Sequence, residues 1–301
     1  MSTHQHAKFQ TVNRGFPPRR VYTVPLRRGG SLCLGERPLV MGIINLSPDS
    51  FAERVPLSLE AAVDLALELQ ACGADLLDLG GESTRPGAAP VSAADERARV
   101  MPALGRIAAR VRVPVSIDTY KAEIAREAID AGATIVNDVS GLQYDPALGG
   151  VVAAAGAVLV LTHTRGRSTA MYAAAVYEDV IREVTDELRA AIARAEATGI
   201  PRGLLIVDPG IGFAKRPEHS YGVLAGLGQI GAVLDRPLLV GPSRKSFMAP
   251  ALDGRPAHER DWGTAAAVTS AVLMGAHIVR VHAVEQMAQV VKVAEEIRRN
   301  G

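Results

Sequence analysis

The sequence predicts a (β/α)8 TIM barrel, in which eight parallel strands alternate with helices and close into one sheet. Eight short apolar runs recur along the chain, and the segments between them repeat apolar residues at helical spacing. Hydrophobic residues make up 48% of the chain and aromatic residues only 4%, a mixture that suits parallel strands packed under alanine-rich helices. A doubly wound open sheet is the alternative, although such sheets usually have about five or six strands.

The segment before the first barrel strand is expected to form an arm and a hairpin. Residues 1–20 contain no apolar core of the kind found in signal peptides, and they are predicted to be a mobile, mildly basic arm. Apolar and polar positions alternate over residues 21–35 around the turn Arg27–Gly30, which is typical of a β-hairpin. We therefore expect a single barrel domain over residues 21–301, with the hairpin included.

The barrel strands and helices are expected to alternate from residue 38 onward. Ser58 suits the N-cap of the first helix and Gly73 suits its end, and Gly199 ends a later helix. The predicted strands are residues 38–46, 74–80, 113–118, 133–138, 157–163, 203–210, 236–241 and 276–282.

Charge and cysteine content exclude several classes of function. The 301-residue chain has a formal net charge of +1, so no overall field draws it toward nucleic acid or a membrane surface. No apolar run approaches the roughly 18 residues of a membrane span. Cys33 and Cys72, the only cysteines, lack metal-ligand spacing and suit a reducing compartment. We therefore expect a cytoplasmic protein with no nucleic-acid or membrane partner.

Polar side chains end the predicted strands. The strand ends carry Asn45, Glu82, Asp118, Asn137, Asp138, His163, Asp208, Ser243, Arg244, Lys245, Arg280 and His282. Any one of them could be polar only because the chain leaves the core for solvent at that point. Because the carboxyl ends of all strands in this fold share one mouth, where ligands bind, we expect the set to form a binding site.

The charges at this mouth suggest two kinds of ligand group. The cationic donors, which suit a phosphate or pyrophosphate, are Arg85, Arg244, Lys245, Arg280 and His282. Asp118, Asn137 and Asp208 offer acceptors for an uncharged heterocycle that carries several N–H donors. The loops 45–56 and 80–91 are rich in Gly, Pro and Ser, and they are candidate lids.

Other motifs have weaker functional interpretations. The stretch "GPSRKS" lacks the spacing of a phosphate-binding Walker loop, and Ser243 lacks the surroundings of a hydrolase nucleophile. His163 and His282 have no paired metal-ligand spacing, so we expect His163 to be a hydrogen-bonded barrel residue. Asp78 lies within a strand and is expected to have an internal structural role, although it could orient a residue at the mouth.

Six motifs, in order, resemble those of the dihydropteroate synthase family. They are "MGIINLSPDSF", "DLGGESTRPGA", "SIDTYKAEIAREAIDAGATIVNDVSG", "DPGIGFAK", "GPSRKSF" and "VRVH". The resemblance implies a (β/α)8 barrel that is a homodimer. It also implies a transferase of folate biosynthesis that joins p-aminobenzoate to 6-hydroxymethyl-7,8-dihydropterin pyrophosphate, giving 7,8-dihydropteroate and pyrophosphate, and that sulfonamides inhibit.

The resemblance also implies roles for individual residues. Asn45 would hold Mg²⁺, the expected cofactor, together with pyrophosphate, since an amide oxygen suits a hard cation. The implied pterin-binding residues are Asp118, Asn137, Asp208 and Lys245, and the implied pyrophosphate-binding residues are Thr84, Arg85, Arg280 and His282. The implied p-aminobenzoate contacts are Phe51, Thr84, Pro86, Phe213 and Ser246, and the implied catalytic residues are Asp49, Lys245, Arg280 and His282.

Two alternative functions stay open at this point. A related barrel moves a methyl group from a reduced folate to a corrinoid, but "SRKSF" and "STRPG" are not needed for that reaction. A paralogue that binds pterin without catalysis is the second alternative. Its best support is Ala52–Val55, where the family usually has a glycine-containing stretch. A second departure from the family is Ala283, where aspartate is frequent and could be a partner for His282.

Overall fold

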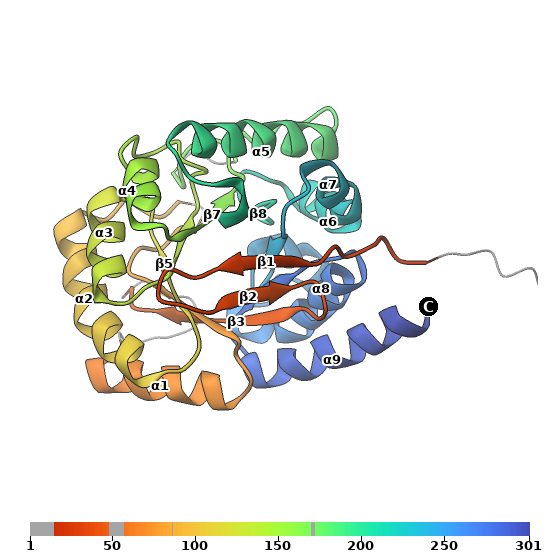
Figure 1. Ribbon diagram of the computed structural model, residues 1–301. Coiled ribbons are helices and arrows are strands. Elements are labelled where there is room, and N and C mark those ends of the chain that lie inside the picture. Colours follow the sequence, from red (N-terminus) through yellow and green to blue (C-terminus); the bar gives the residue numbers. More distant parts are fainter. Residues whose placement is uncertain (1–14, 48–56, 86, 170–171) are drawn as a thin grey trace, which may run out of the picture.

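The chain folds into a closed barrel of parallel strands surrounded by helices (Figure 1). The structure is a computed structural model, and it describes residues 15–47, 57–85, 87–169 and 172–301. Eight strands pair in parallel in the order β8-β7-β6-β5-β4-β3-β10-β9. A parallel bridge between Val207 and Leu238 joins the two outer strands and completes the ring. The predicted (β/α)8 barrel is confirmed, and the open sheet is wrong because the first and last strands meet.

The barrel strands lie inside the apolar runs that predicted them. They are β3 (Leu39–Asn45), β4 (Leu76–Gly80), β5 (Val115–Asp118), β6 (Ile135–Asp138), β7 (Val158–Thr162), β8 (Leu205–Asp208), β9 (Leu239–Val240) and β10 (Ile278–Val281). The helices are α1 (Leu59–Ala71), α2 (Ala93–Arg110), α3 (Ala122–Ala131), α4 (Leu148–Ala155), α5 (Val180–Ala197), α6 (Pro217–Ala225), α7 (Leu227–Leu234), α8 (Asp261–Leu273) and α9 (Val284–Asn300). Within the described ranges, none of these helices is both long and apolar enough to cross a bilayer.

Local signals set the helix boundaries as the sequence predicts. The Ser58 hydroxyl accepts a hydrogen bond from the Ala61 N–H at 3.2 Å, which satisfies a donor that the first turn of α1 leaves open. Gly73 follows α1 with a φ of 101°, a conformation that residues with a Cβ adopt at a cost. Gly199 ends the region of α5 in the same way, with a φ of 93°.

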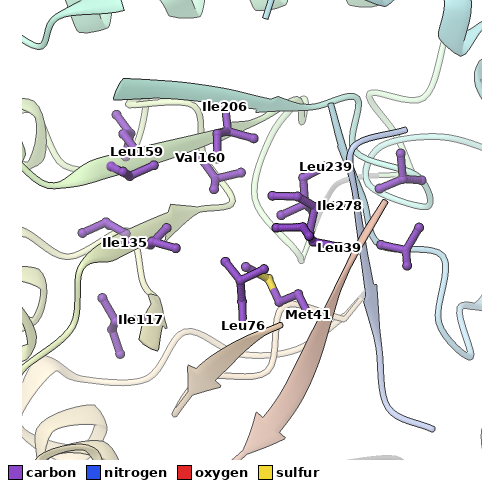
Figure 2. Packing of buried hydrophobic residues seen from close by; sticks show 14 of the residues in the cluster. Leu39, Met41, Leu76, Ile117, Ile135, Leu159, Val160, Ile206, Leu239 and Ile278 are labelled. Atoms are coloured by element: carbon purple, nitrogen blue, oxygen red, sulfur yellow. The ribbon is translucent and has the colours of Figure 1, made fainter. Parts of the chain in front are cut away.

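Aliphatic side chains from all eight barrel strands form the core. Figure 2 shows part of this cluster, with Met41 from β3, Ile117 from β5 and Ile278 from β10 among its members. These three side chains are fully buried. Burial of apolar surface on this scale is the main stabilising contribution in such a fold. It holds the strand ends in fixed positions relative to one another.

The hairpin covers the end of the barrel where the strands begin. Strands β1 (Tyr22–Pro25) and β2 (Ser31–Leu34) pair antiparallel, which confirms the predicted hairpin, and they lie across the ring in Figure 1. Arg27 donates a hydrogen bond to the Ile129 carbonyl, close to the start of β6. The hairpin therefore occupies this end, and the opposite end remains for a binding site.

The last residues of the predicted arm are packed against the barrel. The packed domain therefore begins before residue 21, where the sequence predicts it to begin. The Arg19 side chain is 3% exposed, and it forms an ion pair with Glu295 of α9 at 2.6 Å. Its Nε donates to the Gly35 carbonyl at 3.0 Å. An ion pair with a residue far along the chain cannot be read from local composition. Residues 1–14 of the arm lie outside the described residues.

Candidate active site

A cavity of about 390 Å³ opens at the carboxyl ends of the strands. Its volume is within the usual range for small-molecule sites. Nine of the predicted site residues line it: Asn45, Thr84, Arg85, Asp118, Phe213, Lys245, Ser246, Arg280 and His282. The shared mouth predicted from the strand ends is therefore present.

Arg280 lies at the centre of a buried charge network. Its Nε donates to Asp78 at 2.5 Å, and its Nη2 donates to Asp118 at 2.7 Å. The same Asp78 oxygen accepts a hydrogen bond from the Asn137 side-chain nitrogen at 3.0 Å. Asp78 thus links β4 to β6 and β10. The sequence left the choice between an internal role and an orienting role open, and the structure shows that one buried carboxylate has both.

The ionisation of Asp118 is finely balanced. Burial raises the pKa of its carboxyl to about 7, although the neighbouring Arg280 opposes this rise. Asp78 adds repulsion in the same direction as burial. A carboxyl with its pKa near neutrality in a cleft is typical of functional sites.

Asn137 and Asp208 are buried near this network and are not among the residues that line the cavity. Their exposed fractions are 6% and 5%. One Asp208 oxygen accepts the Gly210 N–H at 2.7 Å. The other is 4.0 Å from the position that a Cβ would take on Gly241, and Gly241 lines the cavity. Asp208 therefore reaches the cavity through a position where the chain carries no side chain.

Lys245 and Phe213 are in contact with one another in the lining of the cavity. The Lys245 Nζ lies 4.0 Å from the centre of the Phe213 ring and donates to the Ile211 carbonyl at 2.6 Å. Burial lowers the pKa of Lys245 to about 8, while the charge of Asp208 opposes this change. An ammonium over an aromatic face is attracted to the ring, which fixes both groups.

His282 is a neutral donor in this structure, which corrects the expectation that it would be a cation. Burial lowers its pKa to about 3, and Arg244 and Arg280 contribute in the same direction. The Ser243 hydroxyl accepts the His282 backbone N–H at 3.1 Å and lies 2.9 Å from Nδ1. We assign the tautomer in which this hydroxyl donates to Nδ1 and the ring proton is on Nε2.

The remaining cationic residues differ in their surroundings. Arg244 forms two hydrogen bonds of 2.8 Å with Asp261, so its charge is paired and it is not the available cation that the sequence suggests. Arg85 donates to the Ser83 hydroxyl at 2.8 Å and lines the cavity. Ser246 lies 3.1 Å from the Tyr172 hydroxyl.

Several residues fall outside this description or were missed. Asp49, Phe51 and Pro86 lie outside the described residues, as does the Ala52–Val55 stretch. Arg260 and Tyr172 line the cavity but belong to loops between barrel elements. No periodicity or strand-end signal marks them, so sequence reasoning had no means of finding them.

His163 is buried and hydrogen-bonded, as predicted.

The described part of the chain holds no cluster of three or more His, Cys, Asp or Glu residues that could enclose a metal ion. Asn45 lines the cavity, and its side-chain oxygen accepts the Ser47 N–H at 2.9 Å. A second lone pair on that oxygen remains for one further partner. Any cation at this place needs oxygen ligands from a bound substrate as well.

Comparisons with known proteins identify the family of this chain. The family model described as "Pterin binding enzyme" matches residues 41–282. A dihydropteroate synthase of Synechocystis is 42% identical over 286 residues, which cover 94% of this chain and 96% of the relative.

Two solved structures extend the likeness to the fold. The Yersinia pestis dihydropteroate synthase in complex with a sulfonamide drug superposes with a TM-score of 0.87 at 37% identity, covering 93% of this chain and 100% of that one. The Xanthomonas albilineans enzyme with 4-aminobenzoic acid gives 0.85 at 38% identity, covering 93% and 99%. The chain therefore belongs to the dihydropteroate synthase family of pterin-binding enzymes.

Proposed function

We propose that this chain joins p-aminobenzoate to 6-hydroxymethyl-7,8-dihydropterin pyrophosphate and releases pyrophosphate, as a transferase of folate biosynthesis. The observation that carries the proposal is the cavity in which Asp118 and Arg280 meet at 2.7 Å. It brings acceptors for a polar heterocycle and cations for a leaving pyrophosphate into one space. The relatives named for this activity, and their complexes with a sulfonamide and 4-aminobenzoic acid, support it.

The pterin ring is proposed to bind Asp118, Asn137, Asp208 and Lys245. The Asn137 nitrogen donates to Asp78, so the amide oxygen is directed away from that carboxylate and can accept a ring N–H. The free oxygen of Asp208 reaches the cavity beside Gly241. Hydrogen bonds to a charged acceptor are about twice as strong as neutral ones, so these carboxylates favour a ring with several donors.

Departure of pyrophosphate is proposed to be the step that the cations assist. The C–O bond to the pterin methylene breaks, and its electron pair leaves with pyrophosphate, near Arg280, the Nε2–H of His282, Thr84 and Arg85. Preorganised donors of this kind stabilise developing charge at no reorganisation cost. The methylene becomes cation-like beside Asp118 and Asp208, the aryl amine forms the new C–N bond, and its proton passes to solvent.

The aryl amine is proposed to lie against Phe213, Ser246 and Thr84. All three line the cavity, and the Ser246 hydroxyl is within 3.1 Å of Tyr172 at its rim. Phe51 and Pro86 are proposed to complete this pocket, and Asp49 to act from the first loop. A sulfonamide, which has the same ring and amine, is expected to compete for this place.

Mg²⁺ is proposed to enter with pyrophosphate, held on the protein side by Asn45. This ion usually keeps several waters and takes one or two protein oxygens plus substrate phosphates. A single amide oxygen, with no cluster of three or more His, Cys, Asp or Glu ligands among the described residues, fits that mode better than a resident metal cage. When bound, the ion neutralises charge on the leaving pyrophosphate. Asn45→Ala should weaken Mg²⁺-dependent pyrophosphate binding and leave the affinity for a pterin without pyrophosphate unchanged.

Assembly and location are further parts of the proposal. Trp262, in the first turn of α8, is 88% exposed, which is unusual for so large an apolar side chain and supports a homodimer. Sedimentation velocity with Trp262→Ser as the comparison tests this. The two free cysteines support a reducing cytoplasm, which fractionation of cells can test.

Release of pyrophosphate that requires p-aminobenzoate tests the central proposal. The chain should release it only when both substrates are present, together with a product of the mass of 7,8-dihydropteroate. Binding of the pterin pyrophosphate without release would favour the non-catalytic alternative.

A further inference from the structure

Lys215 is a lysine with almost no exposed surface, 1% of its side chain, and none of the roles described above uses it. Its Nζ lies 3.1 Å from the Gly210 carbonyl, 3.1 Å from the Phe213 carbonyl and 2.7 Å from Nδ1 of His163. Two of these acceptors belong to the loop between β8 and α6. The third ends β7.

The protonation states in this cluster follow from its geometry. Nε2 of His163 lies 3.0 Å from a Glu187 oxygen, and a carboxylate can only accept, so Nε2 carries the proton. Burial lowers the pKa of His163 to about 4, so the ring is neutral and Nδ1 accepts from Lys215. An ammonium has three N–H donors for these three acceptors, whereas a neutral amine has two. Burial lowers the pKa of Lys215 well below its usual range, although the charge of Asp208 opposes this change. All three acceptors are satisfied only when Lys215 is charged, so these hydrogen bonds favour the ammonium against the effect of burial.

The loop that Lys215 holds builds one wall of the cavity. Gly210, Gly212 and Ala214 adopt φ values of 69°, 79° and 47°. This left-handed backbone conformation is sparsely populated, so contacts with the rest of the protein must stabilise the loop. Between these turns, the Ile211 carbonyl accepts from Lys245, and the Phe213 ring lies against the same ammonium. The position of Lys245 over the cavity therefore depends on the path of this loop.

Lys215 is also linked to Asp208 through Gly210, whose carbonyl accepts from Lys215 at 3.1 Å and whose N–H donates to Asp208 at 2.7 Å. Burial raises the pKa of Asp208, and the charges of Lys245, Lys215 and Arg280 oppose that rise. The charged groups that face Lys215 are Asp208 from β8, Lys245 from the loop after β9, Glu187 from α5 and Arg165 from the loop after β7. Among these neighbours, Asp208 is the one assigned to the pterin.

We propose that Lys215 is a positioning residue whose buried ammonium fixes the loop 209–216, and through it the Lys245–Phe213 pair, and keeps Asp208 ionised for pterin binding. This inference rests on the proposed pterin site. Lys215 touches neither substrate; it acts through the loop and through its charge.

The test is calorimetric titration of Lys215→Met with 6-hydroxymethyl-7,8-dihydropterin pyrophosphate between pH 5.5 and 8.5, with Lys292→Met as a control that removes an exposed lysine. The affinity of Lys215→Met for this pterin should fall about tenfold or more at pH 7, since the variant holds neither the loop 209–216 nor the ionised form of Asp208 in place. The pH below which the pterin affinity of this variant declines should move to a higher value, because Asp208 loses a counter-charge. Lys292→Met should match the unsubstituted chain in both respects.

A pair of substitutions at His163 keeps the inference testable if Lys215→Met does not fold. His163→Asn places an amide oxygen near the position of Nδ1, so it should retain pterin affinity within about threefold, whereas His163→Leu should lose about tenfold. Unchanged affinity and pH dependence in Lys215→Met would overturn the inference, as would equal affinities of the two His163 variants. A uniform loss without movement of the pH below which affinity declines would also overturn the charge role. No binding by the unsubstituted chain would instead refute the proposed function itself, and this inference with it.

Discussion

At the end of the barrel where the strands begin, one buried arginine meets one buried carboxylate, whereas at the mouth several buried charges share partners in a crowded network. Arg19 and Glu295 form an ion pair with exposed fractions of 3% and 9%, and the only further cation paired with Glu295 among the described residues, Arg299, is exposed. At the mouth, Arg280 contacts both Asp78 and Asp118, while Lys245 is attracted to Asp208 and Asp118.

The consequence is visible in the ionisation of the mouth residues. The pKa of Asp118 is raised to about 7 and that of Lys245 is lowered to about 8, so each is moved toward its neutral form. A pKa shift of one unit corresponds to about 1.4 kcal/mol of differential stabilisation between the two forms. The buried charges at the mouth therefore lower the stability of the folded protein, and a bound ligand that pairs with them can offset this loss. The hairpin end contributes stability.

Breaking the ion pair at the hairpin end should have the largest effect on stability. Glu295→Ala leaves the Arg19 guanidinium buried without its carboxylate, so the free energy of unfolding should fall by about 3 kcal/mol or more. Turnover per folded molecule should not change. Urea unfolding and initial rates measure the two quantities. The exposed pair Arg20–Asp235 is the control, and Arg20→Ala should leave the unfolding midpoint in place.

Removing the shared cation at the mouth should instead abolish most activity. Arg280→Met should lower kcat/KM by on the order of 10²–10³, the loss usually seen when one donor to a developing charge is removed. It also leaves Asp78 buried without a counter-charge, so stability should fall. Addition of Asp78→Asn should restore the unfolding midpoint and leave the rate low. Recovery of the rate in the double variant would mean that Arg280 serves the fold alone.

The pH dependence of kcat/KM for the pterin substrate sharpens the same comparison. Asp118 binds as a carboxylate, so the value should rise up to tenfold per pH unit below about 7. Lys245 loses its proton above about 8, so the value should fall there. Asp118→Asn should remove the part of the acidic limb that titrates near pH 7, while titration of Asp208 and of the substrate should remain. Glu295→Ala should leave both limbs where they are.

Most of the fold could be predicted from the sequence, because each strand and helix carries a local signal. Ser58 and Gly73 set the limits of α1, and the apolar runs set the strands. The strand-end residues of the cavity followed from the rule that parallel strands end on one side. That rule predicts where a residue lies, but it does not predict which side chains the residue contacts.

The missing parts of the site depend on contacts between distant segments. Arg280 is paired with Asp78, 202 residues away, and no local pattern shows this. A histidine can carry a positive charge, but burial near two arginines lowers the pKa of His282 and leaves the ring neutral. Lys215 belongs to a recognised motif, yet its role depends on His163, which lies 52 residues earlier. Local patterns predict where a charge lies, and tertiary packing decides whether it remains one.

Thermal unfolding of Lys245→Met with and without the pterin pyrophosphate tests most directly whether the mouth is held at the expense of stability. The folded-state pKa of Lys245 lies below its unfolded value of roughly 10.4, so the charged form is disfavoured in the fold; this penalty is complete below about pH 8 and declines to nothing as the pH rises to roughly 10.4. At pH 7, Lys245→Met should be more stable by about 1–2 kcal/mol, a figure reduced because the Ile211 carbonyl loses its donor. Saturating ligand should stabilise the unsubstituted chain and have little effect on the variant. A variant that unfolds at a lower temperature, or that keeps the full ligand-induced shift, would contradict the account.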